Sequence, residues 1–339
     1  MRRNIGTVGK GMVIIFFSAL LLGLAGPAGA AQPVTLKLSY PVPPTGLAGL
    51  TYEYFAKTVK EESQGQVAIQ TYPSATLVTD QEALDAVRKG NVDIAHCMVS
   101  YISPTIKELT PIDVNGSYLA SNYPKVQEKA DPAVQKIYAK YNVQFLGSSN
   151  SGTLAFAAAK KVGKVIKTPA DMKGLPIRSF GRWISEIIKA WGAAPTTIPL
   201  GDVPVALERG TIAVTIAGWH IFDSTKVHEQ APYITFVDFP NPYQGMIMSE
   251  KAWSSLSDPQ KAAVQRSVKK WQGYADQMVD QTLEKYKQTL KTAGATTYVL
   301  TQAENAAFLK VVDSVMEQAK PVAGPGGEEL FKVLAEIRK

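Results

Sequence analysis

Few residues in this chain could carry out covalent chemistry or bind a metal ion. The sequence has one cysteine, Cys97, and three histidines, His96, His220 and His228. One cysteine rules out an intramolecular disulfide and a multi-cysteine zinc or iron–sulfur site, and three histidines without an H-E-x-x-H context argue against a histidine-built metal centre. Cys97 stands among apolar residues in a predicted strand, which favours a buried, inert thiol over a nucleophile.

The motifs that identify many enzymes are missing as well. Segment 147–152 reads GSSNSG, which is not the G-x-S-x-G of a nucleophile elbow and lacks the lysine and hydroxyl residue of a phosphate-binding loop. No G-x-G-x-x-G follows the first predicted strand, so no dinucleotide site is indicated. From these observations we predict a protein that is not an enzyme and that has no cofactor.

Arg178 is the charged residue whose position points to a binding role. It stands near the end of a predicted strand at 175–179, and open α/β sheets bind their ligands at strand ends. A guanidinium group offers two parallel N–H donors in the geometry of a carboxylate and stays charged, and the pair gains strength when a closing cleft excludes water. The alternative is a salt bridge at the surface or between lobes.

The first half of the chain alternates predicted strands and helices. Residues 34–40 alternate apolar and polar side chains, as a half-buried strand does. A capping box at Thr79–Glu82 opens a helix that stops at Gly90. Further strands are predicted at 67–72, 92–99 and 143–147. This alternation predicts an α/β lobe with a largely parallel sheet.

A second helix cap, Thr168 to Asp171, restarts the pattern. Strands are predicted at 175–179, 211–217, 234–239 and 245–249, with a helix at 183–191 and a short helix capped by Asp202. The chain has 339 residues, 45% of them hydrophobic and 19% charged, which excludes a disordered chain and allows two domains. Two α/β lobes of similar make-up are therefore predicted.

One long helix follows the second set of strands. Ser257 to Gln260 form its cap, and an apolar stripe runs to about Gly294. Such a helix has about 35 residues and is roughly 50 Å long at 1.5 Å per residue, which is longer than one lobe needs. We expect it to lie across both lobes. Two shorter helices with an unmarked break are the alternative.

The first thirty residues have the pattern of an export signal. Basic residues precede an apolar run at 12–24, and Ala28 and Ala30 give the small-residue cleavage pattern. We predict a signal peptide at residues 1–30 and a periplasmic mature protein, with an uncleaved anchor as the alternative. Removal of the leader's three basic residues lowers the formal net charge from +7 to +4. Because acidic residues are interspersed among the remaining basic ones, nucleic-acid binding is not predicted.

Segment 172–178, MKGLPIR, resembles a motif of the substrate-binding proteins of tripartite ATP-independent periplasmic (TRAP) transporters. Other segments similar to this family lie at 65–67, 72–73, 82–93, 191–195, 206–210 and 253–257. Each is a weak signal by itself. Their order and spacing are specific, and the resemblance extends over nearly all of the chain after the leader.

The resemblance implies an α/β, two-lobe periplasmic binding protein fold in which the long helix spans both lobes. Following the family, lobe one comprises residues 32–155 plus 244–283, and lobe two comprises 156–243 plus 284–339. Arg178 falls on the position whose arginine pairs with the ligand's carboxylate. The implied partners are a small organic acid and the membrane subunits of the transporter, and the protein is expected to be a monomer.

The sequence departs from the family pattern around the expected pocket. Many members carry a second arginine at the entry to the second lobe, but segment 151–160, SGTLAFAAAK, has none. Ala213–Val214 and Ala217–His220 stand where the family often has acidic or amide residues. The pocket is therefore expected to be less polar than that of sugar-acid binders. With one guanidinium available, we predict a monocarboxylate with an apolar or aromatic body in preference to a dicarboxylate.

Strand ends supply the other candidate ligand-binding residues. Motif alignment and predicted strand ends place them at Tyr40, Met98, Tyr101, Asn150, Phe180, Trp219, His220 and Tyr243. Core packing is the alternative for each aromatic residue. His220 either donates a hydrogen bond to the carboxylate or caps a strand end.

The predicted function is that of a periplasmic solute-binding receptor, which captures a small organic carboxylate between two lobes and delivers it to the membrane subunits. Two other classes of function stay open at this point. One is a receptor of the same fold that presents its ligand to a sensory system. The other is a periplasmic enzyme, which the missing nucleophile and metal motifs oppose.

Overall fold

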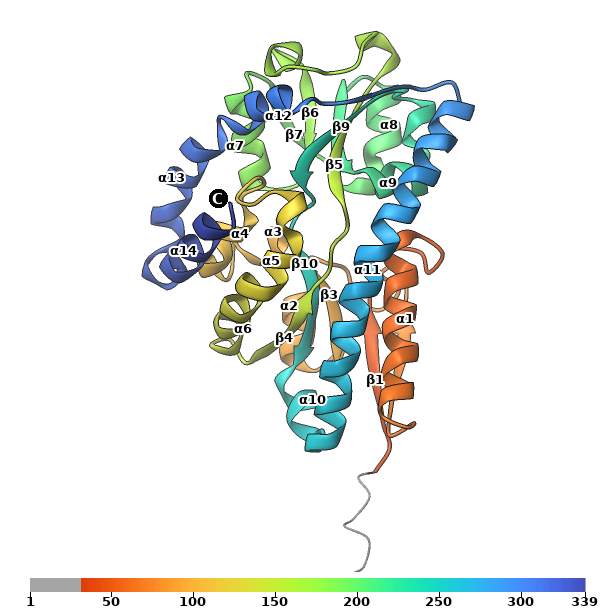
Figure 1. Ribbon diagram of the computed structural model, residues 1–339, viewed down its shortest axis with the longest axis vertical. Helices are drawn as coiled ribbons and strands as arrows, with labels where there is room; N and C mark the ends of the chain where they lie inside the picture. The colour runs from red at the N-terminus through yellow and green to blue at the C-terminus, as the bar shows by residue number, and fades with distance from the viewer. Residues whose placement is uncertain (1–31, 339) are drawn as a thin grey trace, which may run out of the picture. The chain divides into compact units, whose positions relative to one another are not determined.

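Two β-sheets form the framework of residues 32–338, the part of the chain that the computed structural model describes (Figure 1). The predicted leader at residues 1–30 lies outside the described residues. The strands of the first sheet are β1 (Val34–Ser39), β2 (Val67–Tyr72), β3 (Ile94–Met98), β4 (Val143–Ser148) and β10 (Gln244–Ser249). The strands of the second sheet are β5 (Thr153–Ala158), β6 (Pro176–Ser179), β7 (Ala194–Thr197), β8 (Val214–Gly218), β9 (Tyr233–Pro240) and β11 (Thr296–Val299).

Helices cover both faces of each sheet and give the predicted two-lobe α/β fold. They are α1 (Leu47–Glu62), α2 (Ala83–Lys89), α3 (Val99–Ile102), α4 (Thr110–Asp113), α5 (Tyr123–Lys125), α6 (Asp131–Ala139), α7 (Arg182–Ala190), α8 (Val203–Glu208), α9 (Trp219–Ser224), α10 (Glu250–Ser255), α11 (Asp258–Thr292), α12 (Gln302–Leu309), α13 (Val312–Ala323) and α14 (Glu328–Ile337). In the first lobe, α1 and α11 pack on one face of the sheet, and α2, α6 and α14 on the other. In the second lobe, α8, α9 and α11 cover one face, and α7, α12 and α13 the other.

Each sheet is largely parallel, as the alternation of elements predicts, but contains one strand that runs against the others. The first has the order β2-β1-β3-β10-β4, and β10 runs antiparallel to both of its neighbours. The second has the order β11-β9-β5-β8-β6-β7, and β5 runs antiparallel to β8 and β9. The chain passes between lobes along β4 to β5 and back along β9 to β10. Because these links are short, β5 and β10 each enter their new sheet from the end opposite to the one at which its other strands begin. Both strands therefore run antiparallel to their neighbours.

Local sequence signals set the ends of several helices. The side chain of Ser257 accepts a hydrogen bond from the backbone N–H of Gln260, and the reciprocal bond completes the capping box of α11. Thr301 and Glu304 form the same box at α12. Gly90 ends α2 with a φ of 74°, a left-handed conformation that glycine adopts without steric cost.

Helix α11 runs without a break for 35 residues and packs against both lobes (Figure 1). Its first part buries Val268 and Trp271 against the first sheet. Its last part buries Tyr286 and Leu290 with the second-lobe residues of α8 and α9. The alternative of two shorter helices is therefore wrong, and one rigid element joins the cores of both lobes.

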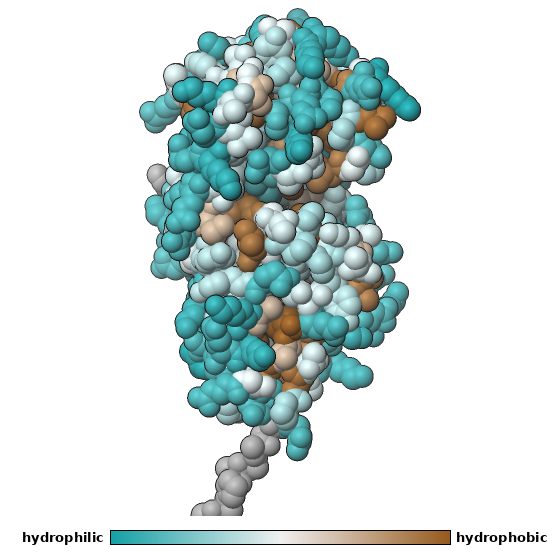
Figure 2. All heavy atoms as spheres, turned by 90° about the vertical axis from the view of Figure 1, so that its right-hand side faces the viewer, coloured by the Kyte–Doolittle hydropathy of each residue, from teal (hydrophilic) through white to brown (hydrophobic). Residues whose placement is uncertain are grey.

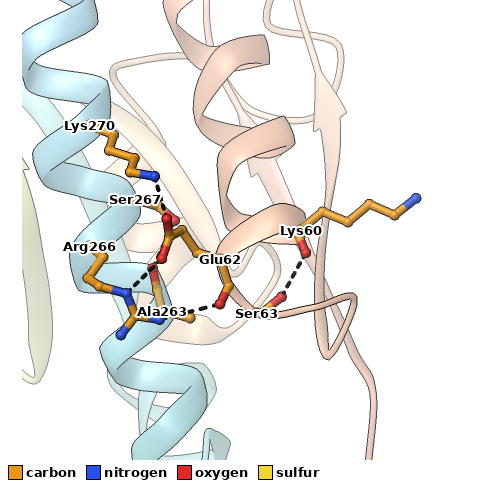
Figure 3. Close-up of polar contacts among 7 residues, drawn as sticks. All are labelled: Lys60, Glu62, Ser63, Ala263, Arg266, Ser267 and Lys270. Atoms are coloured by element: carbon orange, nitrogen blue, oxygen red, sulfur yellow. Dashed lines mark hydrogen bonds and ion pairs between the residues drawn. The ribbon is translucent and has the colours of Figure 1, made fainter.

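Polar and aromatic contacts fix α11 to α1 at the surface of the first lobe. Glu62, at the end of α1, accepts hydrogen bonds from Arg266 and Lys270 of α11 (Figure 3). The rings of Tyr54 and Tyr274 stack with their centroids 4.0 Å apart. Exposed ion pairs of this kind contribute little to stability, so the apolar and aromatic contacts carry most of the attachment. Figure 2 shows the face on which these helices lie, where hydrophobic residues form small, separate groups among hydrophilic ones.

The C-terminal helices lie beside both lobes. Val312 and Val315 of α13 pack in the core of the second lobe. Leu330 and Leu334 of α14 pack instead with residues of the first lobe. The lobe boundaries predicted above stay a prediction. The packing of α14 with the first lobe concerns the segment after residue 324, which that prediction assigns to lobe two.

Candidate functional site

A cavity of about 440 Å³ lies between the two sheets. Strands of both lobes lead into it: Pro41 lies just after β1, Met98 ends β3, Arg178 lies in β6 and Gly218 ends β8. The carboxyl ends of parallel strands converge on such a crevice in open α/β sheets. Side chains from both lobes therefore surround one space, and this space is the candidate ligand site.

Arg178 reaches the cavity from β6 and is held by two backbone carbonyl groups. In the parallel pairing of β6 with its neighbours, Arg178 lies beside Thr196 and Thr215. Its Nε donates to the carbonyl of Ile198 at 3.2 Å, and its Nη1 donates to the carbonyl of Ile216 at 3.0 Å. Only 4% of the residue is exposed. The backbone thus fixes the orientation of a deeply buried guanidinium group.

The charge of Arg178 has no acidic partner among residues 32–338. Burial lowers its pKa to about 10, which still leaves the group charged at neutral pH. The Phe180 ring lies 5.3 Å from Cζ, within range of a cation–π interaction. A guanidinium has five N–H donors, and only two of them are engaged by the described residues. A buried cation with open, planar donors is suited to bidentate binding of a carboxylate.

His220 and Asn241 form a neutral polar wall in the second lobe. His220 lies at the start of α9, and burial lowers its pKa to about 4, so the ring is uncharged at neutral pH. The amide of Asn241 donates to the carbonyl and hydroxyl oxygens of Ser151 at 3.1 and 2.9 Å. A Cβ atom on Gly218 would collide with both His220 and Asn241. Glycine at this strand end therefore leaves the space that both side chains occupy.

Tyr101 contributes an aromatic hydroxyl from the first lobe. It lies in α3, which directly follows β3. The hydroxyls of Ser100 and Ser103 both donate to the buried carboxyl group of Asp113, the second of them at 2.6 Å. These bonds fix the short helix from both sides of Tyr101. Burial raises the pKa of Tyr101, and the nearby Arg178 opposes that rise, which places the two side chains within electrostatic range across the cavity.

A second polar pair lines the first-lobe side of the cavity. His96 of β3 pairs with Asp80 in the loop before α2, with 2.7 Å between Nδ1 and Oδ1. Neither residue is predicted from the sequence as part of the site, because Asp80 lies inside a helix-capping motif and His96 has no metal-binding context. One signal was present. Residues two apart in a strand share a face, so the orientation expected for Met98 also applies to His96.

Five of the nine ligand-binding residues predicted from the sequence line this cavity. They are Met98, Tyr101, Arg178, Phe180 and His220. The cavity is also lined by residues that the sequence did not predict to bind ligand, and they include Val42, Tyr52, Asp80, Gln81, His96, Leu154, Leu200, Ile221, Asn241 and Gln244. Ligand contact by any of them stays a prediction.

Two of the remaining predicted residues, Trp219 and Tyr243, are buried outside the cavity lining. The Trp219 ring stacks on Tyr286 with 6.0 Å between centroids. The hydroxyl of Tyr243 donates to Asp131 at 2.6 Å. Successive residues along extended chain point to opposite sides, and it is Gln244, the next residue, that lines the cavity.

The other two, Tyr40 and Asn150, also lie outside the lining. Tyr40 stacks on Tyr52 with 4.9 Å between ring centroids, and its hydroxyl donates to Glu53. Tyr40 therefore lies behind Tyr52, which does line the cavity. Asn150 accepts a hydrogen bond from the backbone N–H of Gly152 at 2.9 Å. It shapes the link between β4 and β5.

The reactive residue types show no catalytic arrangement in the described part of the chain. Cys97 is buried, and its burial raises the thiol pKa to about 12, so the thiol is protonated at neutral pH. Within residues 32–338, no three histidine, cysteine or acidic side chains come together as a metal site. No helix of that same range has both the length and the apolar character needed to cross a bilayer.

Comparison with known proteins gives one family. Residues 38–321 match the bacterial extracellular solute-binding proteins, family 7. The C4-dicarboxylate-binding periplasmic protein DctP of Rhodobacter capsulatus is 24% identical over 314 residues, which cover 89% of this chain and 90% of that protein. A monocarboxylate 2-oxoacid-binding periplasmic protein of a Nostoc species is 27% identical over 211 residues, covering 60% of this chain and 57% of that protein.

Solved structures agree with this fold. A TRAP periplasmic solute-binding protein from Desulfovibrio salexigens with bound orotic acid superposes with a TM-score of 0.81. The alignment covers 90% of this chain and 98% of that protein at 19% sequence identity. The family match spans most of the chain and includes the strand that carries Arg178. The chain therefore belongs to family 7 of the bacterial extracellular solute-binding proteins, the solute-binding proteins of TRAP transporters.

Proposed function

We propose that this protein is a periplasmic receptor that binds a small organic carboxylate between its two lobes, with Arg178 holding the carboxylate group. The observation that carries the proposal is the burial of the Arg178 guanidinium without an acidic partner among residues 32–338. Keeping an ion in the interior without a counter-charge is costly. An anionic ligand supplies the missing charge and accepts the open N–H donors.

The family membership supports an organic acid as the class of ligand. The Rhodobacter relative is named for C4-dicarboxylates and the Nostoc relative for monocarboxylate 2-oxoacids. Both kinds of acid carry a carboxylate that one guanidinium can bind. The membrane subunits of a TRAP transporter are the proposed partner, and we infer a monomeric receptor with no catalytic activity and no affinity for nucleic acid.

Within this class we favour a monocarboxylate with an apolar or aromatic body. Among the described residues that line the cavity, Arg178 is the one lysine or arginine. His220 is uncharged at neutral pH because burial lowers its pKa to about 4, and Asp80 adds negative charge to the wall. A second carboxylate would meet repulsion there, whereas Phe180 and Ile221 offer apolar contacts to the body of the ligand.

The proposed mechanism couples binding to closure of the lobes. The lining residues come from both lobes, so a ligand in the cavity contacts both. A ligand that makes more contacts in the closed arrangement shifts the population toward it. The membrane subunits then recognise the closed form. Helix α11, with buried residues in both lobes, limits the motion to small bending around the crossing strands.

Ligand identification tests the proposal. The full chain is expressed, the exported protein is purified, and small molecules that remain bound are identified by mass spectrometry. In parallel, the rise in melting temperature is measured with a panel of monocarboxylic and dicarboxylic acids. We expect a carboxylate to be found and monocarboxylates to give the larger rise. Dicarboxylates that bind far more tightly than matched monocarboxylates would contradict the favoured class.

An arginine variant tests the anchor directly. Arg178→Met removes the guanidinium and should weaken carboxylate binding by about 2–5 kcal/mol in isothermal titration calorimetry. Arg182→Met is the matched control, because Arg182 lies four residues along on α7, stacks on Trp183 and is absent from the cavity lining. Unchanged affinity in Arg178→Met would show that another group holds the carboxylate.

A further inference from the structure

The cavity carries an acidic side chain, Asp80, on its first-lobe side, whereas Arg178 belongs to the second lobe. Asp80 and His96 both line the cavity on its first-lobe side and are largely buried, with 15% and 6% of their side chains exposed. Their one mutual contact joins Asp80 Oδ1 to His96 Nδ1 at 2.7 Å. Asp80 is the one acidic side chain among the described residues that line the cavity.

The hydrogen-bond capacity of this pair is incompletely used. Among residues 32–338, no side chain or backbone group donates to Asp80 Oδ2, and no lysine or arginine lies within ion-pair distance. A carboxylate only accepts hydrogen bonds, so His96 Nδ1 carries the proton that Asp80 accepts. Asp80 Oδ2 therefore remains a free acceptor in the lining of the cavity.

Tyr52 and Tyr101 are the aromatic neighbours of this pair. The Tyr52 ring packs edge-on against His96 with 5.9 Å between centroids. The pKa of Tyr101, raised chiefly by burial, is lowered by Arg178 and raised by Asp80. Tyr101 thus lies within electrostatic range of both charges, and all three residues line the same cavity.

We propose that the natural ligand carries a hydrogen-bond donor, a hydroxyl or an amino group, at the end remote from its carboxylate, and that Asp80 is the specificity-determining residue that binds this donor. The inference rests on the proposed function, because it takes Arg178 as the site of the carboxylate. Burying the free oxygen of Asp80 under an apolar ligand end would leave an acceptor unsatisfied, which costs free energy. A donor at that position removes the cost, whereas a second carboxylate adds repulsion.

Two matched sets of probes test this. The first consists of hexanoate, 6-hydroxyhexanoate, 6-aminohexanoate and adipate. The second consists of 4-methylbenzoate, 4-(hydroxymethyl)benzoate, 4-(aminomethyl)benzoate and terephthalate. Calorimetry on the unmodified protein should show the amino compound of the better-fitting set binding about tenfold more tightly than the methyl compound, the hydroxyl compound several-fold more tightly, and the dicarboxylate most weakly. Preference for the hydroxyl alone or the amino group alone identifies which donor the site takes.

Asp80→Asn then tests the residue. It keeps the shape of the side chain and removes the charge, so the advantage of the amino compound should fall to about twofold while the affinity for the methyl compound stays nearly unchanged. Asp85→Asn is the matched control, since Asp85 pairs with Lys89 on the exposed side of α2 and does not line the cavity. The ligand preference of the unmodified protein is the second measurement, and it needs no variant to fold.

The outcomes separate the two proposals. Equal affinity for the methyl, hydroxyl and amino compounds, or a preference that survives Asp80→Asn, overturns the role of Asp80 and leaves the carboxylate receptor intact. Loss of all binding in Arg178→Met with the preference present in the unmodified protein supports both. Failure of every carboxylate in both sets to bind the unmodified protein overturns both.

Discussion

Asp131 and Arg178 are both buried ionisable side chains, with 5% and 4% exposure, but the groups around them differ. Asp131 accepts four hydrogen bonds, from the backbone and hydroxyl of Ser148, from Tyr243 and from Gln272. Arg178 makes two hydrogen bonds, both to backbone carbonyls, and has no counter-charge among the described residues. The carboxyl group of Asp131 is surrounded by hydrogen-bond donors, whereas the guanidinium group of Arg178 is held in orientation and keeps N–H donors that no described residue accepts.

This difference separates a structural polar group from a binding group. The donors around Asp131 come from β4, from the residue before β10 and from α11, so its carboxyl joins three segments that are distant in the sequence. The partners of Arg178 aim its remaining donors without using them. Burial and charge alone do not distinguish the two roles. The number of engaged hydrogen-bonding positions does.

The largest expected effect is a loss of stability on substitution of Asp131, the buried group that is surrounded by hydrogen-bond donors. Asp131→Ala leaves the donors on Ser148, Tyr243 and Gln272 without their acceptor. Because unsatisfied buried donors are costly, we expect the free energy of unfolding to fall by about 3–5 kcal/mol in urea denaturation. Asp131→Asn keeps the shape and one acceptor and should lose less. The affinity of Asp131→Asn for carboxylates should equal that of the unmodified protein, and an equally stable Asp131→Ala would remove the distinction.

Asp113 sharpens the comparison because it accepts two hydrogen bonds, both from hydroxyl groups, where Asp131 accepts four. Burial raises its pKa from 3.8 to about 6, so the folded state binds the proton more tightly than the unfolded chain. Its contribution to stability is fully present below about pH 4 and is lost as the pH rises through 6, by about 3 kcal/mol at most. Asp113→Asn lacks this pH-dependent contribution, because an amide does not titrate in this range.

Urea denaturation between pH 4 and pH 7 measures that prediction. The stability of the unmodified protein relative to Asp113→Asn should decrease as the pH rises across this window. Parallel pH profiles for the two proteins would mean that the carboxyl group ionises in the folded state without the cost of burial.

The elements could be predicted from the sequence where the signal is local. Capping boxes and apolar periodicity located α11 within two residues of both observed ends, because the cap and the buried stripe lie in the helix itself. The direction of β5 and β10 could not be predicted this way. A strand that crosses between lobes has the same alternation as one that does not, and its direction is set by the sheet that receives it.

The residues of the site could likewise be predicted from the sequence only in part. Arg178, Phe180 and His220 line the cavity because they lie at or just after strand ends, where the sequence argument placed them. Tyr243 and Gln244 show its limit, since one residue step along extended chain decides which of them faces the cavity. Asp80 could not be predicted as a site residue, because Thr79 and Glu82 match a helix cap that explains the segment without any ligand.

Substitution of Arg178 should change the stability of the ligand-free protein in the opposite direction to substitution of Asp131. Replacing a buried, unpaired cation with an apolar side chain of similar length removes a desolvation cost. In the absence of ligand, Arg178→Met should therefore leave the free energy of unfolding unchanged or raise it by about 1 kcal/mol, the opposite of Asp131→Ala. Denaturation of ligand-free protein, prepared by unfolding, dialysis and refolding, measures this. A clear loss of stability would mean that its two carbonyl contacts hold the second lobe together.

The smallest expected effects come from removing a single hydroxyl group, at Tyr101 or at Tyr243. Tyr101 lines the cavity across from Arg178, whereas Tyr243 donates to Asp131 outside it. Tyr101→Phe should weaken carboxylate binding by about 0.5–1.5 kcal/mol and leave stability nearly unchanged, while Tyr243→Phe should lower stability by a similar amount and leave binding unchanged. Calorimetry and denaturation on both variants make each the control of the other. If both variants lost affinity equally, the Asp131 cluster would be coupled to the cavity, and the two kinds of buried polar group would belong to one functional unit.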